Sequence, residues 1–248
     1  MNESAPDLST TPRLFVEAPL LAGAEIRLEG PQAHYLGSVM RRQPGDMVRL
    51  FDGVHGEWAA RVVSVARKAV VLRLEVQSAP QEAVPDLWLC FAPLKRGRID
   101  WLVEKACELG VARLVPVQTR RTIVDRLNPE RLMAHMVEAA EQCGRTALPE
   151  LADMVSLSAL LAGWPAARTL YFADEALAGQ ALPFKGLATT SDSPAAILIG
   201  PEGGFMAEEA AAIRALAPAR AVSLGPRILR ADTAAIAAVA VWQTGLTA

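Results

Sequence analysis

The sequence predicts an α/β protein in which a small β-barrel precedes a mostly parallel sheet covered by helices. Three observations support this fold class: strand-like segments dominate residues 12–79, a polar stretch with two prolines covers 80–86, and strands alternate with helices from residue 87 onward. Such alternation is typical of a parallel sheet with helices on both faces. A length of 248 residues allows one large domain or two smaller ones. The change of pattern at the proline-containing linker favours two.

The first part of the chain is expected to begin with a loose tail over residues 1–11, which are polar. This tail has neither a basic start nor an apolar stretch, so it does not form a secretion signal. Strands are expected at Met47–Phe51, Glu57–Val65 and Ala69–Val76, with turn residues between them. Short strands with partial alternation predict a small antiparallel barrel over residues 12–79.

Between these strands, Gln32–Arg42 shows the apolar spacing of a helix. Its last two residues, Arg41 and Arg42, have two readings. They could complement the helix dipole at its carboxyl end. They could also contact phosphate groups of a nucleic acid. His34 and His55 stand alone, without partners that could share a metal ion.

The second part of the chain alternates between buried strands and helices. Strands are expected at residues 87–92, 111–117, 169–173, 195–199 and 221–224, and helices at 99–109, 129–140, 207–213 and 232–242. The last of these helices is alanine-rich and apolar on nearly every side. Such a helix is buried on nearly every side, and at a chain end a homodimer is the simplest source of the cover.

Two of the expected strands end in glycine–proline turns, Gly200–Gly204 and Gly225–Pro226. Parallel strands place both turns at one edge of the sheet, where α/β proteins bind ligands. Glycine lets a ligand approach the backbone closely. The alternative is that Gly-Pro merely ends a strand. No lysine follows as in a P-loop, and the spacing is not that of a dinucleotide fingerprint. The turns therefore favour a neutral or zwitterionic ligand.

A third turn at the same edge, residues 93–98, carries the cations Lys95, Arg96 and Arg98. It is either a solvated loop or a phosphate clamp beside the ligand pocket. The formal net charge of −2 does not by itself indicate a nucleic-acid binder, but cations concentrate in the first half of the chain.

Other bulk properties limit the class of protein. The three cysteines are odd in number and far apart, which predicts neither a disulfide nor a zinc site. No apolar run approaches the roughly 20 residues of a membrane span. We therefore expect a cytoplasmic protein without metal or membrane partners.

Taken together, several motifs resemble a known family. Leu198–Gly204 with Leu224–Arg230 closely resembles the SPOUT methyltransferases, specifically the RsmE family, and residues 104–111, 141–145, 12–15 and 50–53 match as well. The resemblance covers about Pro12 to Trp242. It implies a PUA-like RNA-binding barrel followed by a SPOUT domain with a trefoil knot over residues 87–248. It also implies a homodimer that uses S-adenosylmethionine to methylate N3 of a uridine in 16S ribosomal RNA, in the small ribosomal subunit.

The resemblance also implies roles for individual residues. Arg230 and Asp232 are the catalytic candidates, Arg230 stabilising the uridylate and Asp232 handling its proton. The family usually has Thr-Glu-Thr where this chain has Ala231-Asp232-Thr233, so the carboxylate is one methylene shorter. Phosphate or RNA contacts are expected from Arg13, Arg41, Arg42, Lys95 and Arg98. Cofactor contacts are expected from Leu198, Ile199, Gly200, Pro201, Glu202, Gly203, Gly204, Leu224, Gly225, Ile228, Leu229 and Thr233.

Three alternatives remain at this point. A sibling SPOUT enzyme could act on another RNA or on a ribose 2′-hydroxyl, although the asparagine-rich motif expected of ribose-directed enzymes is absent. A non-catalytic RNA-binding assembly factor could have kept the fold, which the intact glycine turns disfavour. A nucleotide-dependent dehydrogenase is disfavoured by the glycine spacing.

Overall fold

The computed structural model of the chain describes residues 11–177 and 193–245. It divides into two compact units, one of residues 1–83 with 140–147 and one of 84–139 with 148–248. The division after residue 83 falls within the expected linker, and the expected tail lies outside the described residues except for Thr11. Residues 140–147 join the first unit because the Glu82 carboxylate accepts hydrogen bonds from Arg145 Nε (3.1 Å) and Ala147 N (2.9 Å). This return of the chain to the first unit was not predicted from the sequence.

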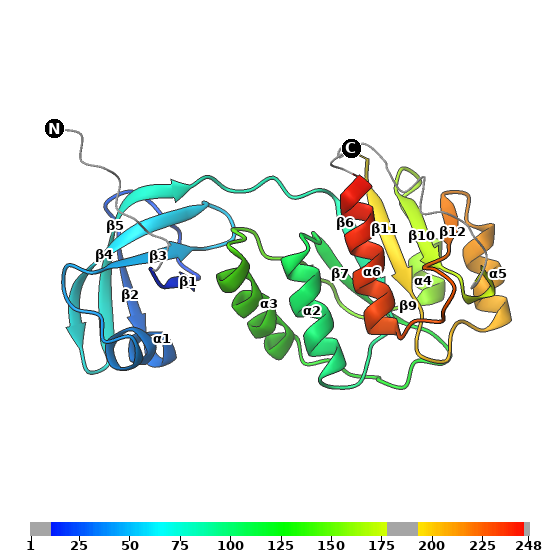
Figure 1. Cartoon of the computed structure of the whole chain (residues 1–248), viewed down its shortest axis with the longest axis horizontal. Coiled ribbons are helices and arrows are strands. Elements are labelled where there is room, and N and C mark those ends of the chain that lie inside the picture. The colour runs from blue at the N-terminus through cyan, green and yellow to red at the C-terminus, as the bar shows by residue number, and fades with distance from the viewer. Residues whose placement is uncertain (1–10, 178–192, 246–248) are drawn as a thin grey trace. The chain divides into compact units, whose positions relative to one another are not determined.

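The first unit is built on a five-stranded sheet with the order β1-β3-β4-β5-β2 (Figure 1). All neighbouring pairs are antiparallel except β1 and β3, which run parallel. Alternating leucine and valine side chains fill its interior, including fully buried Leu36, Val48, Leu50 and Leu72. The strands are β1 (Arg13–Phe15), β2 (Glu25–Glu29), β3 (Met47–Phe51), β4 (Glu57–Ala66) and β5 (Ala69–Ala79). The predicted barrel-like β domain is thus confirmed, with one parallel pair that was not expected.

The single helix expected at Gln32–Arg42 is wrong in its extent and type. The structure has a short α1 (Gly30–His34) that continues as one π-helical turn, η1 (Tyr35–Val39). Arg41 and Arg42 lie beyond this turn, and Arg41 has a positive φ of 51°. They therefore do not cap an α-helix. Gly37 lets the turn approach the sheet, since a Cβ there would lie 3.3 Å from Val65 Cγ1.

The second unit contains a seven-stranded sheet in which every pair is parallel. Its order is β12-β10-β11-β6-β7-β8, with β9 paired to β7. The strands are β6 (Leu87–Phe91), β7 (Arg113–Gln118), β8 (Glu150–Leu151), β9 (Val155–Ser156), β10 (Thr169–Ala173), β11 (Ala195–Ile199) and β12 (Ala219–Val222). The predicted mostly parallel sheet is confirmed. Strand β12 ends at Val222, two residues before the strand end expected at Leu224, so Ser223–Pro226 forms a loop.

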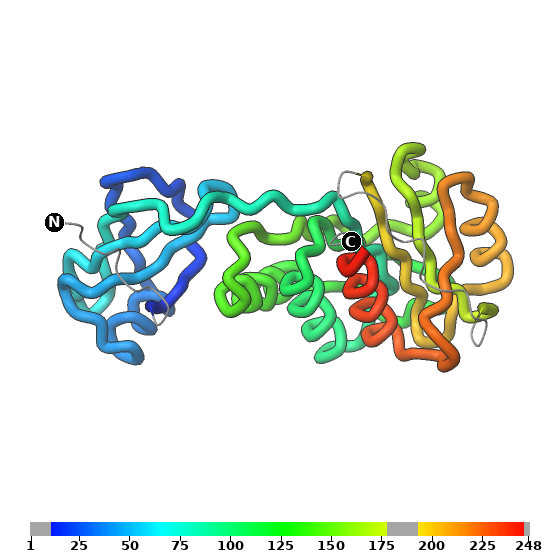
Figure 2. Tube along the Cα trace, turned by 45° about the horizontal axis from the view of Figure 1, so that its top comes forward, coloured from blue at the N-terminus to red at the C-terminus, as the bar shows by residue number. Residues whose placement is uncertain are grey.

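Helices cover both faces of this sheet because its strands are apolar on both sides. On one face, α6 packs against α2, β6 and β11, as Figures 1 and 2 both show. On the other face, Leu157 of α4 and Ile213 of α5 pack on Cys90, Leu170 and Leu198. The helices are α2 (Arg98–Glu108), α3 (Pro129–Cys143), α4 (Leu157–Ala162), α5 (Ala207–Ala215) and α6 (Ala231–Thr244), with a 3₁₀ turn η2 (Glu175–Leu177).

The core of the second unit contains the fully buried thiol of Cys90. Burial raises the pKa of the Cys90 thiol to about 12, so Cys90 is an apolar core residue and not a nucleophile.

Helix α6 buries one face, with Ala235, Ala238 and Trp242 inaccessible, while Ala237, Ala240 and Val241 stay partly exposed in this chain. The partly exposed side is the one that the expected homodimer would cover, and that expectation stays a prediction. None of the helices within the described ranges is both long and apolar enough to span a membrane.

Candidate functional site

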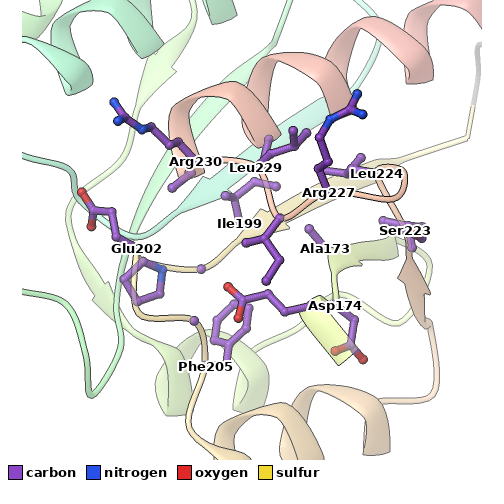
Figure 3. Close-up of a pocket in the computed structure, with 18 of the residues that line it drawn as sticks. Ala173, Asp174, Ile199, Glu202, Phe205, Ser223, Leu224, Arg227, Leu229 and Arg230 are labelled. Carbon is purple, nitrogen blue, oxygen red and sulfur yellow. The ribbon is translucent and has the colours of Figure 1, made fainter. Parts of the chain in front are cut away.

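The candidate site lies where three neighbouring parallel strands, β12, β10 and β11, end at the same edge of the sheet. A cavity of about 240 Å³ opens there between the loops that follow these strands (Figure 3). Strand β10 lies between the other two and pairs with both, Phe172 with Leu198 on one side and with Ala221 on the other. The cavity is lined by Ala173, Asp174, Glu175, Ile199, Gly200, Pro201, Glu202, Gly204, Phe205, Val222, Ser223, Leu224, Gly225, Arg227, Ile228, Leu229, Arg230, Ala231 and Ala234.

The structure brings most of the sequence-predicted pocket residues together. Three of them do not line the cavity. Leu198 is fully buried within β11, and Thr233 is exposed on α6. A Cβ on Gly203 would lie 3.3 Å from Arg121 Cδ, so this position faces Arg121 and not the cavity. Those that do line it are Ile199, Gly200, Pro201, Glu202, Gly204, Leu224, Gly225, Ile228 and Leu229.

Sequence reasoning missed the contribution of β10. This strand was expected at residues 169–173, and its carboxyl end carries the adjacent acids Asp174 and Glu175. Asp174 is ion-paired with Arg214 of α5 (Nη2 to Oδ2, 2.6 Å). Glu175 has no hydrogen bond or ion pair among the described residues and lines the cavity. The sequence did indicate that these two acids lie at the ligand-binding edge, because parallel strands share one carboxyl edge. It did not indicate that β10 lies next to β11 and β12, because strand order could not be read from the sequence.

The first glycine turn is held from several sides. Gly204 has a φ of +67°, and a Cβ there would lie 2.6 Å from Glu175 Oε2. Arg121 donates a hydrogen bond to the carbonyl of Gly203. The Glu209 carboxylate accepts from the backbone N–H groups of Met206 (2.9 Å) and Arg120 (2.8 Å). The turn is thereby fixed to the loop after β7 and to the start of α5.

The second loop offers its backbone to the cavity. Within the described part of the chain, the N–H groups of Leu224 and of residues 227–230 donate to no protein acceptor. The apolar side chains of Ile199, Leu224 and Leu229 line the same cavity (Figure 3). Unpaired backbone donors beside apolar side chains suit a flat, heteroatom-bearing ligand.

The predicted catalytic residues lie at the mouth of the cavity. Arg230 lines it and is exposed, and Figure 3 shows the side chains of Arg230 and Arg227 directed away from Phe205 and Asp174. No carboxylate pairs with Arg230 among the residues that the structure describes. Asp232 is not a lining residue, although its side chain is only 16% exposed.

Arg98 connects two of these predicted residues. Its guanidinium lies 3.6 Å from Glu202 Oε1 and 3.9 Å from Asp232 Oδ2. The loop after β6, the first glycine turn and the start of α6 therefore converge on one cation. The phosphate contact predicted for Arg98 stays a prediction, and the structure adds that its guanidinium lies beside Asp232, one of the two catalytic candidates.

The remaining predicted RNA contacts differ in accessibility. Lys95 and Arg41 are exposed, and Arg42 is half-buried. Arg13 is only 7% exposed, pairs with Glu57 (Nε to Oε2, 2.5 Å) and donates to the carbonyls of Ala140 and Arg145. Its guanidinium is occupied in the interior of the first unit, so we assign Arg13 a structural role in place of the predicted RNA contact. No group of three or more potential metal ligands occurs in the described ranges.

Comparisons with known proteins agree with this fold and site. A family model described as an RNA methyltransferase domain matches residues 80–243, and one described as an RNA methyltransferase PUA domain matches residues 28–75. These two matches define the class as RNA methyltransferases with an amino-terminal PUA domain.

Individual relatives narrow the class. Ribosomal RNA small subunit methyltransferase E from Synechocystis sp. is 32% identical, over 92% of this chain and 76% of its own length. The Rickettsia conorii protein of the same name is 28% identical, over 92% of this chain and 93% of its own length. A Neisseria gonorrhoeae ribosomal RNA small subunit methyltransferase E, solved with S-adenosyl methionine, superposes with a TM-score of 0.81 at 25% identity, covering 94% of this chain and 97% of that one. The chain belongs to the ribosomal RNA small subunit methyltransferase E family, which confirms the resemblance to the RsmE family.

Proposed function

We propose that this protein transfers a methyl group from S-adenosylmethionine to small-subunit ribosomal RNA, at N3 of a uridine. The observation that carries the proposal is the cavity at the joined ends of β10, β11 and β12, with backbone donors on one wall and a free cation at its mouth. The family relationship supports the RNA substrate, and the relative from Neisseria gonorrhoeae supports the cofactor.

The residues present suit S-adenosylmethionine. The unpaired N–H groups of residues 227–230 and the side chains of Leu224 and Leu229 would hold the adenine ring. Glu175, a lining carboxylate with no ion pair among the described residues, would accept hydrogen bonds from ribose hydroxyls or from the ammonium group. The bound cofactor supplies an electrophilic methyl carbon with a neutral leaving group, so the protein needs mainly to align the acceptor with it.

The protein's own residues must manage the acceptor's proton, because uridine N3 is protonated at neutral pH. Arg230, exposed at the mouth and without an ion pair to any described residue, would stabilise the negative charge that develops as N3 loses its proton. Asp232 follows two residues later at the start of α6, where it would accept this proton directly or through water. Arg98 keeps a positive charge beside Asp232, with its Nε 3.9 Å from Oδ2.

We further propose that the protein acts as a homodimer on RNA within the small subunit, in the cytoplasm. The support for a dimer is apolar surface in the second unit: Val241 and Ala237 on α6 are partly exposed, Trp101 on α2 is 41% exposed and Ile228 is 72% exposed. Apolar patches of this kind are usually covered by a partner.

The function is tested by incubating the purified protein with tritiated S-adenosylmethionine and small ribosomal subunits from cells that lack the enzyme, followed by nucleoside mass spectrometry. We expect label in the small-subunit RNA and a nucleoside that co-elutes with 3-methyluridine. Label on ribose or on C5 would contradict the N3 assignment, and absence of transfer to any ribosomal RNA would contradict the function itself.

A further inference from the structure

Helix α2 begins at the loop that carries Arg98, and its first turn is capped from within the helix. Gly97 precedes the helix with a positive φ of 87° and has no side chain that could accept a hydrogen bond at this end. The carboxylate of Asp100, three residues later, reaches back instead, and its Oδ2 accepts from the N–H of Gly97 at 3.1 Å. Asp100 therefore fixes the backbone immediately before Arg98.

The other carboxylate oxygen of Asp100 faces helix α3, which lies beside α2 (Figures 1 and 2). Oδ1 lies 3.2 Å from Nη2 of Arg131 and 3.8 Å from Nε2 of His135. This oxygen is buried and makes no well-aligned hydrogen bond to a described residue, so Arg131 acts on it chiefly through charge. Nδ1 of His135 lies 2.9 Å from Oε1 of Glu104, also on α2. Two side chains of α3 thus keep the Asp100 carboxylate in the orientation that caps α2.

Arg98 is the link between Asp100 and the candidate site, because Asp100 itself does not line the cavity. The Arg98 guanidinium lies 3.6 Å from Glu202 Oε1 and 3.9 Å from Asp232 Oδ2. Both distances exceed those of a hydrogen bond, and the Arg98 side chain is 40% exposed, so these carboxylates alone hold it weakly. The place of the guanidinium therefore depends on the backbone that carries it, which Asp100 fixes.

We propose that Asp100 is a positioning residue for methyl transfer, which holds Arg98 beside Asp232 by capping α2 and pairing with Arg131. The inference rests on the proposed function, in which Asp232 accepts the proton of uridine N3. Loss of the cap would let the first turn of α2 fray and the Arg98 guanidinium move away from Asp232. A cap that served only the stability of α2 would have no such effect on Arg98, and this difference can be measured.

The experiment measures single-turnover methylation of small ribosomal subunits by Asp100→Ala, Asp100→Asn, Arg98→Gln and the double variant Arg98→Gln/Asp100→Ala. The matched control is Ser156→Ala, which also removes a helix cap from the second unit, the hydrogen bond from Ala159 N–H to Ser156 Oγ (3.2 Å). Ser156 does not line the cavity. Thermal unfolding and calorimetry with S-adenosylhomocysteine report the stability and the cofactor pocket of every variant.

We expect Asp100→Ala to slow methyl transfer roughly tenfold and to leave S-adenosylhomocysteine affinity unchanged, because a displaced Arg98 affects the reaction and not the cavity. The same substitution should cause no further loss in the Arg98→Gln variant, which has no guanidinium to position. Asp100→Asn keeps an oxygen that can accept from Gly97, so its loss should be smaller than that of Asp100→Ala. Ser156→Ala should lower the melting temperature without slowing methyl transfer.

The place of Arg98 can also be followed without any activity. Phenylglyoxal reacts with guanidinium groups, and peptide mass spectrometry gives the rate at which Arg98 is labelled. We expect Arg98 to be labelled severalfold faster in Asp100→Ala than in the parent protein, because the guanidinium is no longer held between two carboxylates. In Ser156→Ala it should be labelled at the parent rate.

The proposal is overturned if Asp100→Ala transfers methyl groups at the parent rate, if it slows the Arg98→Gln variant as much as the parent protein, or if it leaves the labelling of Arg98 unchanged. An Arg98→Gln variant with the parent rate also overturns it, since Arg98 would then need no positioning. Failure of the parent protein to methylate small subunits would contradict the proposed function instead, and the labelling of Arg98 would still test whether Asp100 holds it.

Discussion

At the scale of single residues, two arginines near the mouth of the cavity differ in their carboxylate neighbours. Arg230 is exposed without a carboxylate neighbour in the described part of the chain, whereas Arg98 lies near both Glu202 and Asp232. Ion pairs with such exposure contribute little to folding stability, about 1 kcal/mol or less. We therefore expect the charges of these two arginines to affect the methyl-transfer reaction more than the folding stability.

Replacing Arg230 by alanine should depress turnover roughly 100-fold, because its charge interacts chiefly with the uridylate formed in the transition state. Affinity for S-adenosylhomocysteine should change little, since the side chain is directed out of the cavity. Single-turnover methylation and calorimetry measure the two quantities. A fully active variant would remove Arg230 from the mechanism while leaving the proposed reaction in place.

Asp232→Asn should slow methyl transfer roughly 10- to 100-fold if the carboxylate accepts the proton, and Asp232→Glu should be tolerated because it restores the residue that the family usually carries. If Arg98 acts through Asp232, the double variant Arg98→Gln/Asp232→Asn should be no slower than Asp232→Asn alone. Additive losses would show instead that Arg98 has a separate role, such as the phosphate contact predicted from the sequence.

At the scale of elements, the loop after each of three parallel strands contributes a different wall to the cavity. The first glycine turn supplies a close backbone approach, the loop after β12 supplies unpaired donors, and the end of β10 supplies carboxylates. The two adjacent glycines of the first turn have different tasks. Gly204 needs its positive φ and faces Glu175, while Gly203 faces Arg121.

Gly204→Ala should therefore weaken S-adenosylhomocysteine binding about tenfold, a free-energy change of about 1.4 kcal/mol, because alanine opposes the left-handed backbone and pushes on Glu175. Gly203→Ala is the matched control and should have a smaller effect, since the flexible Arg121 side chain can move aside. Calorimetry on both folded variants decides, and equal losses would contradict the separate roles of the two glycines.

At the scale of the whole molecule, one apolar side of α6 stays partly exposed among the residues that the structure describes. Val241 and Ala237 lie on the partly exposed side, whereas Ala238, although on the same helix, is packed inside the unit. A test of association must therefore use the outer side, because a charge at Ala238 would damage the core of the monomer itself.

Val241→Glu should convert a dimer to a monomer at micromolar concentration, because it would place an unpaired charge in the interface. Ala212→Glu adds the same charge on the exposed side of α5 and should leave the dimer intact. Sedimentation velocity reports both outcomes. An unmodified protein that sediments as a monomer would contradict the dimer.

The sequence by itself determined three strands of the first unit (β3, β4 and β5), most strands and helices of the second unit, and both glycine turns. It did not predict the short elements β1, β2, β8, β9 and α4, and it was wrong about the helix at Gln32–Arg42. The features that it determined are encoded locally, by the period of apolar residues and by glycine and proline at strand ends. Family membership also followed from the sequence, because the motifs Leu198–Gly204 and Leu224–Arg230 are contiguous and specific.

Only the tertiary structure decided which residues meet. Strand order placed β10 between β12 and β11 and so brought Asp174 and Glu175 into the cavity. Long-range pairing buried Arg13 with Glu57, 44 residues away. The physical reason is common to these cases: a side chain's environment depends on neighbours distant in sequence, whose positions are set by sheet topology and core packing and not by any local period.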